Sequence, residues 1–335
     1  MTTRYAQAHL PTLLAGPGDA RPTALDIIKD NDLENALGDK IMLVTGTSSG
    51  IGIETVRALK ATGAKIYATA RNLEKGRQAL AGVLEPGKVE LLELDTASFA
   101  SVRECAKEFL AKESKLNVLI NNAGIMAVPE CRLTEDGYEL QFQTNHLGHF
   151  LLFQLLKPTL LASSTPEFAS RVVSVSSIGH RQSRIVFDDL NLQKPGAYAP
   201  FVSYGQSKTA NIYMANEIER RYGARGLHAW SLHPGGIDTG LQVHVDFSAM
   251  KEIPEIQRAM KSPDQGAATS VLAAVDKELE GQGGKYLDDC AVSPPVKPEL
   301  ASELGAPGAA PWVYDEEDAK KLWTVSSKIV GVDEV

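Results

Sequence analysis

A tyrosine and a lysine stand four residues apart in the segment Tyr204-Gly-Gln-Ser-Lys208, and Tyr204 is the only one of nine tyrosines with this spacing. On a helix, residues four apart lie on one face, so the two side chains meet. A phenol with a pKa of about 10 exchanges protons poorly at neutral pH, but a neighbouring ammonium favours the phenolate and lowers that pKa. The pair predicts a general acid and base for a carbonyl or an alcohol, although this spacing also arises by chance in a chain of this kind.

A glycine-rich turn is the second candidate. The run Thr45-Gly-Thr-Ser-Ser-Gly-Ile-Gly52 follows the apolar residues 41–44 and precedes a helical pattern over 51–62. Glycines permit positive φ and leave the backbone bare, and a helix N-terminus offers free N–H groups and a positive dipole end. Strand, turn and helix together predict a phosphate site for a dinucleotide. A purely structural turn is the alternative.

The elements that would position these residues alternate along the chain. Apolar runs predict strands at 41–44, 65–69, 89–94, 118–120, 171–175, 228–232 and 285–287, with helices at 51–62, 73–81, 98–113, 135–162, 203–222 and 263–280 between them. This order predicts an α/β fold with a doubly wound, mostly parallel seven-stranded sheet of the Rossmann type.

We expect a single catalytic domain over 39–290 that includes long substrate loops at 178–202 and 237–262. An N-terminal extension, 1–38, is expected to pack on the outside. The C-terminal extension, 291–335, turns amphipathic from Asp315 to Trp323 and could be a lid, an interface arm or a loose end.

Composition limits the class of function. The formal net charge of −8 disfavours nucleic acid as a partner. No stretch approaches the roughly 20 apolar residues of a membrane span, and three separated cysteines indicate neither a disulfide framework nor a metal site. No Cys, Asp or Glu near His146 and His149 completes a set of metal ligands. We expect a soluble, cytoplasmic protein without a metal that acts on a small molecule.

Further motifs follow one another between residues 40 and 290. They are Asp95 after the third expected strand, Asn121-Asn122-Ala123-Gly124 after the fourth, Asn145 in Thr-Asn-His-Leu-Gly, Ser176-Ser177 ending the fifth, and Pro234-Gly235 with Thr239 after the sixth. With the glycine turn and the Tyr204/Lys208 pair, this ordered set resembles the short-chain dehydrogenase/reductase family, in its retinol dehydrogenase-like branch. The resemblance implies an oxidoreductase that uses a nicotinamide coenzyme.

The resemblance also implies roles for single residues. Tyr204 would be the general acid and base, Lys208 its pKa modulator and a ribose ligand, Ser177 the holder of the substrate oxygen, and Asn145 the support of a water relay. Ser176 is the alternative to Ser177. Asp95 and Thr96 would contact adenine, and Thr239 the carboxamide or a phosphate. The implied coenzyme residues are Gly46, Ser48, Ser49, Gly50, Ile51, Gly52, Arg71, Asp95, Thr96, Asn122, Ala123, Gly124, Tyr204, Lys208, Pro234, Gly235, Ile237 and Thr239.

The end of the second expected strand bears on the choice of coenzyme. It reads Ala68-Thr-Ala-Arg71, with Ala70 where an NAD-preferring relative would carry an acidic residue. An acidic side chain there binds the ribose 2′-hydroxyl of NAD, whereas arginine accommodates the 2′-phosphate of NADP. We predict NADP(H). The alternative interpretation of Arg71 is a solvated surface charge.

The two long loops suggest the substrate. They carry the apolar residues Ile185, Phe187, Tyr198, Phe201, Leu241, Val243, Val245, Phe247 and Met250, which favour a lipophilic or aromatic ketone or alcohol, unless they only pack the loops down. His180 and Arg181 either line the substrate mouth or lie in a solvent-facing loop. We expect a carbonyl reductase or alcohol dehydrogenase. A dinucleotide-binding redox sensor or scaffold without turnover is the alternative.

The helices at 135–162 and 203–222 bear on assembly. Their apolar stretches, notably 150–153 and 155–156, predict a homodimer or homotetramer, because the family that the chain resembles commonly associates through such helices. A monomer is the alternative, since either extension could cover the same face.

Overall fold

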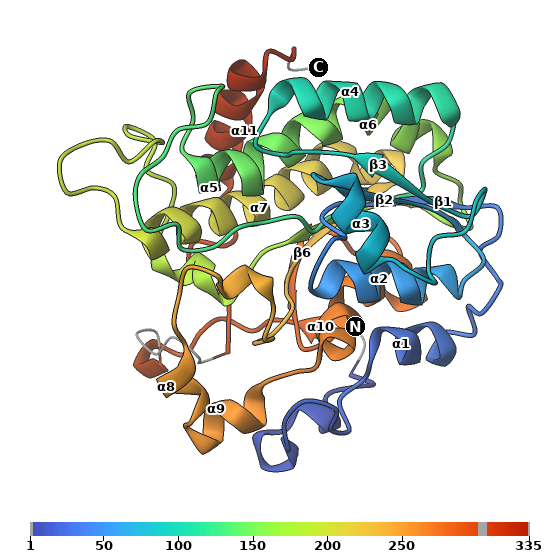
Figure 1. Ribbon diagram of the computed structural model, residues 1–335, viewed down its shortest axis with the longest axis horizontal. Helices are drawn as coiled ribbons and strands as arrows, with labels where there is room; N and C mark the ends of the chain where they lie inside the picture. The colour runs from blue at the N-terminus through green and yellow to red at the C-terminus, as the bar shows by residue number, and fades with distance from the viewer. Residues whose placement is uncertain (1–2, 301–306, 334–335) are drawn as a thin grey trace.

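The sheet lies at the centre of the computed structural model, which describes residues 3–300 and 307–333 (Figure 1). Its strands are β1 (Ile41–Val44), β2 (Lys65–Ala70), β3 (Val89–Glu93), β4 (Val118–Asn121), β5 (Ser170–Val175), β6 (Leu227–His233), β7 (Lys285–Asp288) and β8 (Ala291–Val292). They are ordered β3-β2-β1-β4-β5-β6-β7-β8, and every neighbouring pair is parallel except β7 and β8. The Rossmann-type fold is confirmed, and β8 adds one strand to the expected seven.

Helices cover both faces of the sheet (Figure 1). On one face lie α1 (Ala24–Asp30), α2 (Ile51–Lys60) and α10 (Pro263–Val275), and on the other α4 (Phe99–Lys112), α6 (Gly148–Ser163), α7 (Pro200–Tyr222) and α11 (Glu316–Val330). The remaining helices are α3 (Leu73–Ala79), α5 (Leu140–Phe142), α8 (Ser248–Lys251) and α9 (Pro254–Ala259), with short turns η1 (Gln7–His9), η2 (Pro11–Leu13), η3 (Gln143–Leu147), η4 (Ile178–Gln182), η5 (Gly223–Arg225), η6 (Gly240–Gln242), η7 (Lys277–Leu279) and η8 (Pro298–Leu300).

Alternation along the strands builds the two cores. In β1, Met42 and Val44 belong to the core under α2 and α10, while Leu43 belongs to the core under α4, α6 and α7. Successive side chains of a strand point to opposite faces, so a run that is apolar throughout is buried on both.

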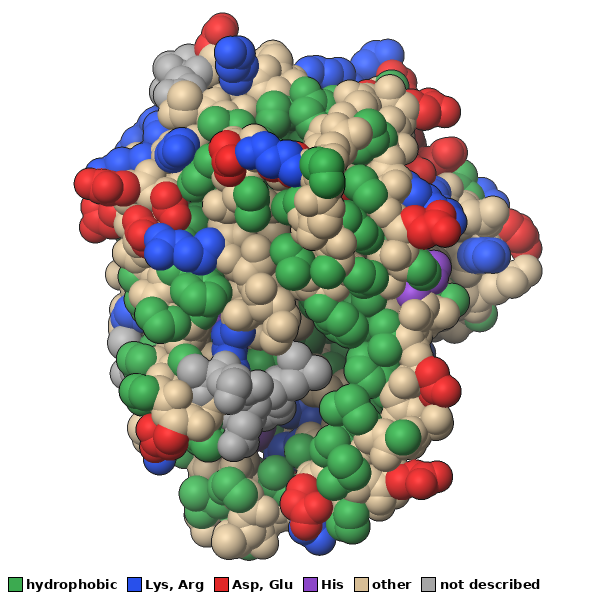
Figure 2. Space-filling model, turned by 90° about the vertical axis from the view of Figure 1, so that its left-hand side faces the viewer, with side chains coloured by type: hydrophobic (Ala, Val, Ile, Leu, Met, Phe, Trp, Pro, Cys, Tyr) green, Lys and Arg blue, Asp and Glu red, His purple; other side chains and the backbone are tan. Residues whose placement is uncertain are grey.

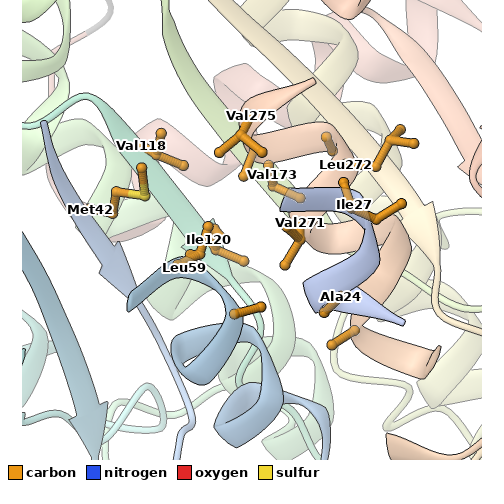
Figure 3. Packing of buried hydrophobic residues seen from close by; sticks show 14 of the residues in the cluster. Ala24, Ile27, Met42, Leu59, Val118, Ile120, Val173, Val271, Leu272 and Val275 are labelled. Atoms are coloured by element: carbon orange, nitrogen blue, oxygen red, sulfur yellow. The ribbon is translucent and has the colours of Figure 1, made fainter. Parts of the chain in front are cut away.

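Helix α1 of the N-terminal extension packs against the outer side of α10, and its apolar side chains are buried there. Thr23 and Asp26 form a capping box that starts α1, and Ile27 and Ile28 are fully buried. Figure 3 shows Ala24 and Ile27 of α1 beside the α10 residues Val271, Leu272 and Val275. Helix α10 is buried from Gln265 to Val275 without a polar face, so it needs cover on its outer side, and α1 supplies it.

The C-terminal extension contributes a packed helix. The Trp323 ring of α11 lies 4.9 Å from the Phe150 ring and 6.0 Å from the Phe153 ring, centre to centre, and the Arg221 guanidinium lies 4.7 Å from the Trp323 ring centre. Residues 150–153 are therefore fully buried within one chain. Helix α11 therefore packs on the apolar stretch of α6 from which we predicted a dimer or tetramer. This matches the monomer alternative, and the oligomeric state stays a prediction. Residues 301–306 and 334–335 of the extension lie outside the described residues.

The strand order places a binding site at one edge of the sheet. The order reverses between β1 and β4, and ligands of such sheets bind beyond the carboxyl ends of the strands at that point. Among the described residues, no helix has the length and apolar content to cross a bilayer. The cytoplasmic location stays a prediction.

Candidate active site

A cavity of about 1190 Å³ lies beyond the carboxyl ends of β1, β4, β5 and β6. Every expected coenzyme residue lines it except Gly52, and Ser177 lines it as well. A Cβ atom at Gly52 would stand 2.4 Å from the carbonyl oxygen of Gly46, so this glycine permits the close packing of α2 on the turn. The structure thus brings together residues that are up to 193 positions apart, from Gly46 to Thr239.

The glycine turn has the backbone of an anion site. Gly46 (φ +71°) and Gly50 (φ +63°) adopt conformations that L side chains rarely adopt, and a Cβ at Gly46 would lie 2.6 Å from the Ala123 Cα. No side chain of the described residues caps the N-terminus of α2 after Gly50. The first two N–H groups of α2, those of Ile51 and Gly52, have no acceptor within the helix, and Ile51 lines the cavity wall. These residues fit the diphosphate of a dinucleotide.

Hydrogen bonds join this turn to the end of β4. The Thr45 hydroxyl oxygen accepts the backbone N–H groups of Asn122 and Ala123, each at 2.9 Å. The side-chain amide of Asn122 donates to the carbonyl oxygens of Thr45 (2.8 Å) and Gly46 (3.1 Å). The amide nitrogen of Asn122 therefore holds the turn, and its implied contact with a coenzyme stays a prediction. The sequence reasoning missed Thr45, because a threonine after a strand carries no pattern.

The two histidines considered as metal ligands have structural roles. His149 Nε2 lies 2.9 Å from the Thr45 hydroxyl, and His149 Nδ1 lies 3.0 Å from the carbonyl oxygen of Asn145. Because the Thr45 oxygen already accepts two N–H groups, it donates to Nε2, and the ring proton sits on Nδ1. Burial lowers the pKa of His149 to about 4, so the ring is neutral. His146 Nε2 lies 2.9 Å from the Ser326 hydroxyl of α11.

Tyr204 and Ser177 meet at the cavity. Tyr204 lies in the first turns of α7 and is 3 % exposed, and the Ser177 hydroxyl is near enough to oppose the rise of its pKa. A Cβ at Gly179 would stand 2.7 Å from the Tyr204 ring, so this glycine lets the turn after β5 approach the tyrosine. Ser176, the alternative, donates from its hydroxyl to the carbonyl oxygen of Lys208 at 2.8 Å. Of the two serines, Ser177 is the one that faces Tyr204.

Burial controls the protonation of the tyrosine and the lysine. Burial raises the pKa of Tyr204 to about 12, against a smaller lowering effect of the nearby Ser177 hydroxyl, and burial lowers the pKa of Lys208 to about 8. The Lys208 ammonium lies 5.6 Å from the Tyr204 ring centre and donates to the carbonyl oxygen of Val175 at 3.1 Å. The lowered tyrosine pKa that we predicted is therefore wrong for this structure, because desolvation outweighs the lysine. Tyr204 keeps its proton at neutral pH and is suited to donate it.

Asn145 lies in a π-helical turn, η3, where we expected a continuous helix over 135–162. Its Oδ1 accepts the N–H of Ile125 at 2.9 Å, and its Nδ2 donates to the carbonyl oxygen of Ile125 (3.0 Å) and to the Ser207 hydroxyl (2.9 Å). Such turns recur at functional sites. A Cβ at Gly124 would stand 3.1 Å from Asn145 Oδ1 and 3.4 Å from Lys208 Nζ. The two side chains thus flank the same glycine.

The loop over 237–262 lines the cavity, whereas most of the loop over 178–202 packs down. Leu241, Val243, Phe247 and Met250 line it, together with Phe201 at the start of α7. Figure 2 shows hydrophobic side chains around a hollow on the side of the molecule that carries α8. By contrast, Ile185 and Phe187 pack in the core under α7, Val245 packs beside the cavity, and Tyr198 donates to the carbonyl oxygen of Val128 at 2.6 Å.

His180 does not line the substrate mouth or face solvent. Its ring is buried, Nδ1 lies 2.6 Å from the carbonyl oxygen of Ser177, and Nε2 accepts the N–H of Ala310 at 3.0 Å. The histidine therefore ties the turn of Ser177 to the C-terminal extension. Arg181 donates to the carbonyl oxygen of Leu300 at 3.1 Å.

The sequence reasoning missed part of the cavity wall. His233 and Lys261 line it, as do residues of the N-terminal extension: His9, Pro11, Leu14 and Arg21. Lys261 stands directly before the Ser-Pro-Asp-Gln start of α10, a signal that concerns the helix and not the lysine. The extension residues show no periodic pattern, so only their tertiary contacts reveal them.

Comparisons with known proteins agree with this geometry. Residues 40–189 match the family model of short chain dehydrogenase. The chain is 57% identical over 334 residues to short-chain dehydrogenase/reductase prx1 of Penicillium roqueforti, covering 99% of this chain and 96% of the relative. It is 36% identical over 304 residues to human polyprenol dehydrogenase, covering 89% and 87%. A solved structure from Mycobacterium paratuberculosis matches with a TM-score of 0.68 at 32% identity, covering 94% and 99%.

Proposed function

Because this chain belongs to the short-chain dehydrogenase/reductase family, we propose that it is an NADP(H)-dependent carbonyl reductase or alcohol dehydrogenase for a lipophilic or aromatic ketone or alcohol. One observation carries the proposal. The hydroxyl-bearing side chains of Tyr204 and Ser177 flank Gly179 at the wall of a cavity that also contains the glycine turn. A substrate oxygen at these hydroxyls and a coenzyme on the turn would share one enclosed space.

The protein's own groups supply the proton and the orientation. NADPH held by the glycine turn and Arg71 would supply a hydride for the carbonyl carbon. As charge develops on the substrate oxygen, Ser177 holds it by a hydrogen bond and Tyr204 transfers its proton to it. A phenol whose pKa is about 12 still protonates an alkoxide, because the alkoxide is the stronger base. General acid catalysis of this kind contributes about 10²–10⁴-fold to the rate.

Lys208 and Asn145 would return a proton to Tyr204. The two side chains flank Gly124, and the Lys208 ammonium lies near the tyrosine ring. We infer that Lys208 holds the ribose and passes a proton on, with Asn145 supporting a water. The hydrogen bonds of Asn145 to Ile125 and Ser207 fix its position for this task.

Arg71 supports the choice of NADP(H). It follows β2, is exposed, and lines the cavity. Within the described part of the chain, no hydrogen bond or ion pair engages its guanidinium. An arginine so placed is available for a 2′-phosphate, and no carboxylate stands at Ala70 to repel that phosphate.

The cavity wall supports a lipophilic substrate. Beside Tyr204 it carries Met126, Phe201, Leu241 and Phe247, which form one cluster with the tyrosine ring. One relative is named for a polyprenol, a lipophilic alcohol. An apolar wall with two convergent hydroxyls orients a carbonyl group on an otherwise apolar molecule.

The test is a panel of aliphatic, aromatic and isoprenoid carbonyl compounds assayed with NADPH. Tyr204→Phe keeps the ring and deletes the transferable proton, so reduction should fall by about 10²–10⁴-fold while NADPH still binds. Tyr138→Phe, outside the cavity wall, is the matched control and should keep the activity. Near-full activity of Tyr204→Phe would refute the mechanism. NADPH binding without turnover on any carbonyl would favour the non-catalytic sensor.

A further inference from the structure

We propose that the N-terminal extension forms the outer wall of the substrate pocket, with Arg21 as a positioning residue for the loop over 237–262 and Leu14 as a determinant of substrate selectivity. The part of this proposal that concerns substrate rests on the proposed function. The observations come from the loop, from the contacts of Arg21 and from the residues that line the cavity.

The loop lacks a core of its own. From Asp238 to Met260 no side chain is buried, and α8 and α9 contain no buried residue. Its internal ion pairs, Lys251 with Asp238 at 2.8 Å and Arg258 with Glu255 at 3.1 Å, are exposed or partly exposed, and such pairs add little stability. The loop nevertheless supplies much of the apolar cavity wall. Its position must therefore depend on contacts with other segments.

Arg21 makes the main contact. Its side chain is 4 % exposed and donates to the carbonyl oxygens of Ala259 (2.8 Å), Met260 (2.5 Å) and Arg258 (3.4 Å). These carbonyls end α9, where no intrahelical donor remains, and the planar guanidinium reaches all three. The Asp19 carboxylate accepts from Arg21 Nε at 2.8 Å and balances its charge.

Backbone contacts reinforce this connection. The N–H of Gly16 donates to the Arg258 carbonyl oxygen at 3.1 Å, and the N–H of Gly18 donates to Gln265 Oε1 at 3.0 Å. The Gln265 amide in turn donates to the carbonyl oxygen of Arg21 at 3.1 Å. The segment over 16–21 is thus fastened to the end of α9 and to the start of α10.

The same extension reaches the cavity itself. His9, Pro11 and Leu14 line it, as do Ile256 and Met260 of the loop. His9 Nε2 lies 3.6 Å from Asp289, and Asp289 is paired with Lys261 at 2.6 Å. Lys261 lies 3.4 Å from the carbonyl oxygen of Pro234 in the turn after β6.

The position of Leu14 and Pro11 outside the Tyr204 cluster predicts which kinetic constants their substitution would change. Leu14 and Pro11 line the cavity but do not belong to the cluster around Tyr204, so they would touch a part of the substrate other than its carbonyl group. A change there alters binding of the substrate more than the chemical step. We therefore expect effects on KM and selectivity, with kcat and the Kd of NADPH nearly unchanged.

Leu14→Ala tests the wall, with Leu13→Ala as its matched control. Leu13 is 50 % exposed in the neighbouring turn and does not line the cavity. With the best lipophilic carbonyl of the panel, Leu14→Ala should raise KM about three- to tenfold, because a lost apolar contact at a partly exposed site changes discrimination by about this much. Leu13→Ala should leave KM within twofold. Equal KM values for the two variants would overturn the assignment of Leu14.

Arg21→Ala and Arg21→Lys test the positioning role without a substrate. Hydrogen exchange of the amides over 254–260 should become at least about tenfold faster in Arg21→Ala, and Arg21→Lys, which keeps the charge but loses the planar fork, should lie between it and the wild type. The amides of β4 should be unaffected. Unchanged exchange over 254–260 would overturn the role of Arg21. If the wild type reduced no carbonyl, the proposed function would fail, while the exchange result would still decide the positioning role.

Discussion

Replacing Arg71 with alanine separates NADPH from NADH recognition. Arg71 lies on the cavity wall at the end of β2, and within the described residues its guanidinium has no protein partner to lose. The variant should therefore fold normally. Any change in affinity then reports the contact with the coenzyme. NADH lacks the 2′-phosphate, so its binding should not depend on this side chain.

The exposure of Arg71 sets the magnitude. A hydrogen bond to a charged group contributes about 1.5–3 kcal/mol, and exposure to solvent places this one at the lower end. About 1.4 kcal/mol corresponds to a tenfold change in a dissociation constant. We expect Arg71→Ala to weaken NADPH binding about tenfold and to leave NADH binding within twofold.

The measurement is a fluorescence titration of each coenzyme against each protein. Arg77→Ala is the matched control, because Arg77 is an exposed arginine of α3 outside the cavity wall. Its Kd for NADPH should equal that of the wild type. The difference caused by Arg71→Ala should shrink as salt rises, since exposed charges are screened. Equal weakening of NADPH and NADH, or a wild type that prefers NADH, would refute the assignment of NADP(H).

Further variants and conditions test the rest of the site and the fold. Burial places the pKa of Lys208 at about 8, and its ammonium exists below that pH, so kcat/KM for reduction should fall about tenfold per unit as pH rises above 8. Initial rates between pH 6 and 10 check this, and a flat profile would contradict a role for the charged lysine. Asn145→Ala removes buried hydrogen bonds to Ile125 and Ser207, so the free energy of unfolding measured by urea titration should fall by about 2–4 kcal/mol. An unchanged midpoint of the titration would contradict a stabilising role of these bonds. Trp323→Ala should lower it by about 3–5 kcal/mol and, by uncovering α6, raise the light-scattering mass above that of one chain, 36.1 kDa. A wild-type mass of two or four chains would show that α11 does not take the place of a partner.

The local pattern of apolar residues was sufficient to predict most strands of the sheet. The apolar run at 41–44 coincides with β1, and the other expected strands differ from the observed ones by one or two residues. Strands buried on both faces are continuous apolar runs, which a sequence displays directly. Strand β8 has only two residues, which is too short for a recognisable pattern of apolar residues, so it could not be predicted. The π-turn around Asn145 depends on the Ile125 backbone and on Ser207, contacts that a local pattern does not contain.

The site was partly predictable for a topological reason. Carboxyl ends of parallel strands meet at one edge, so Gly46, Asn122, Ser177 and Pro234 had to be neighbours once the strands were known. Their protonation and orientation were not predictable, because burial of Tyr204 and the amide contacts of Asn122 depend on packing.

The long-range contact of Arg21 with the end of α9 has a consequence for how the chain is made. The two partners are 237 residues apart, and ribosomes add about 5–20 residues per second, so Arg21 waits roughly 12–50 s for its acceptors. During that interval Ile27 and Ile28 of α1 also lack α10, their cover in the native core. The nascent chain therefore exposes the apolar surface of α1 until α10, Pro263–Val275, has been made. The cavity wall that Arg21 and the loop over 237–262 form together is therefore completed late in synthesis.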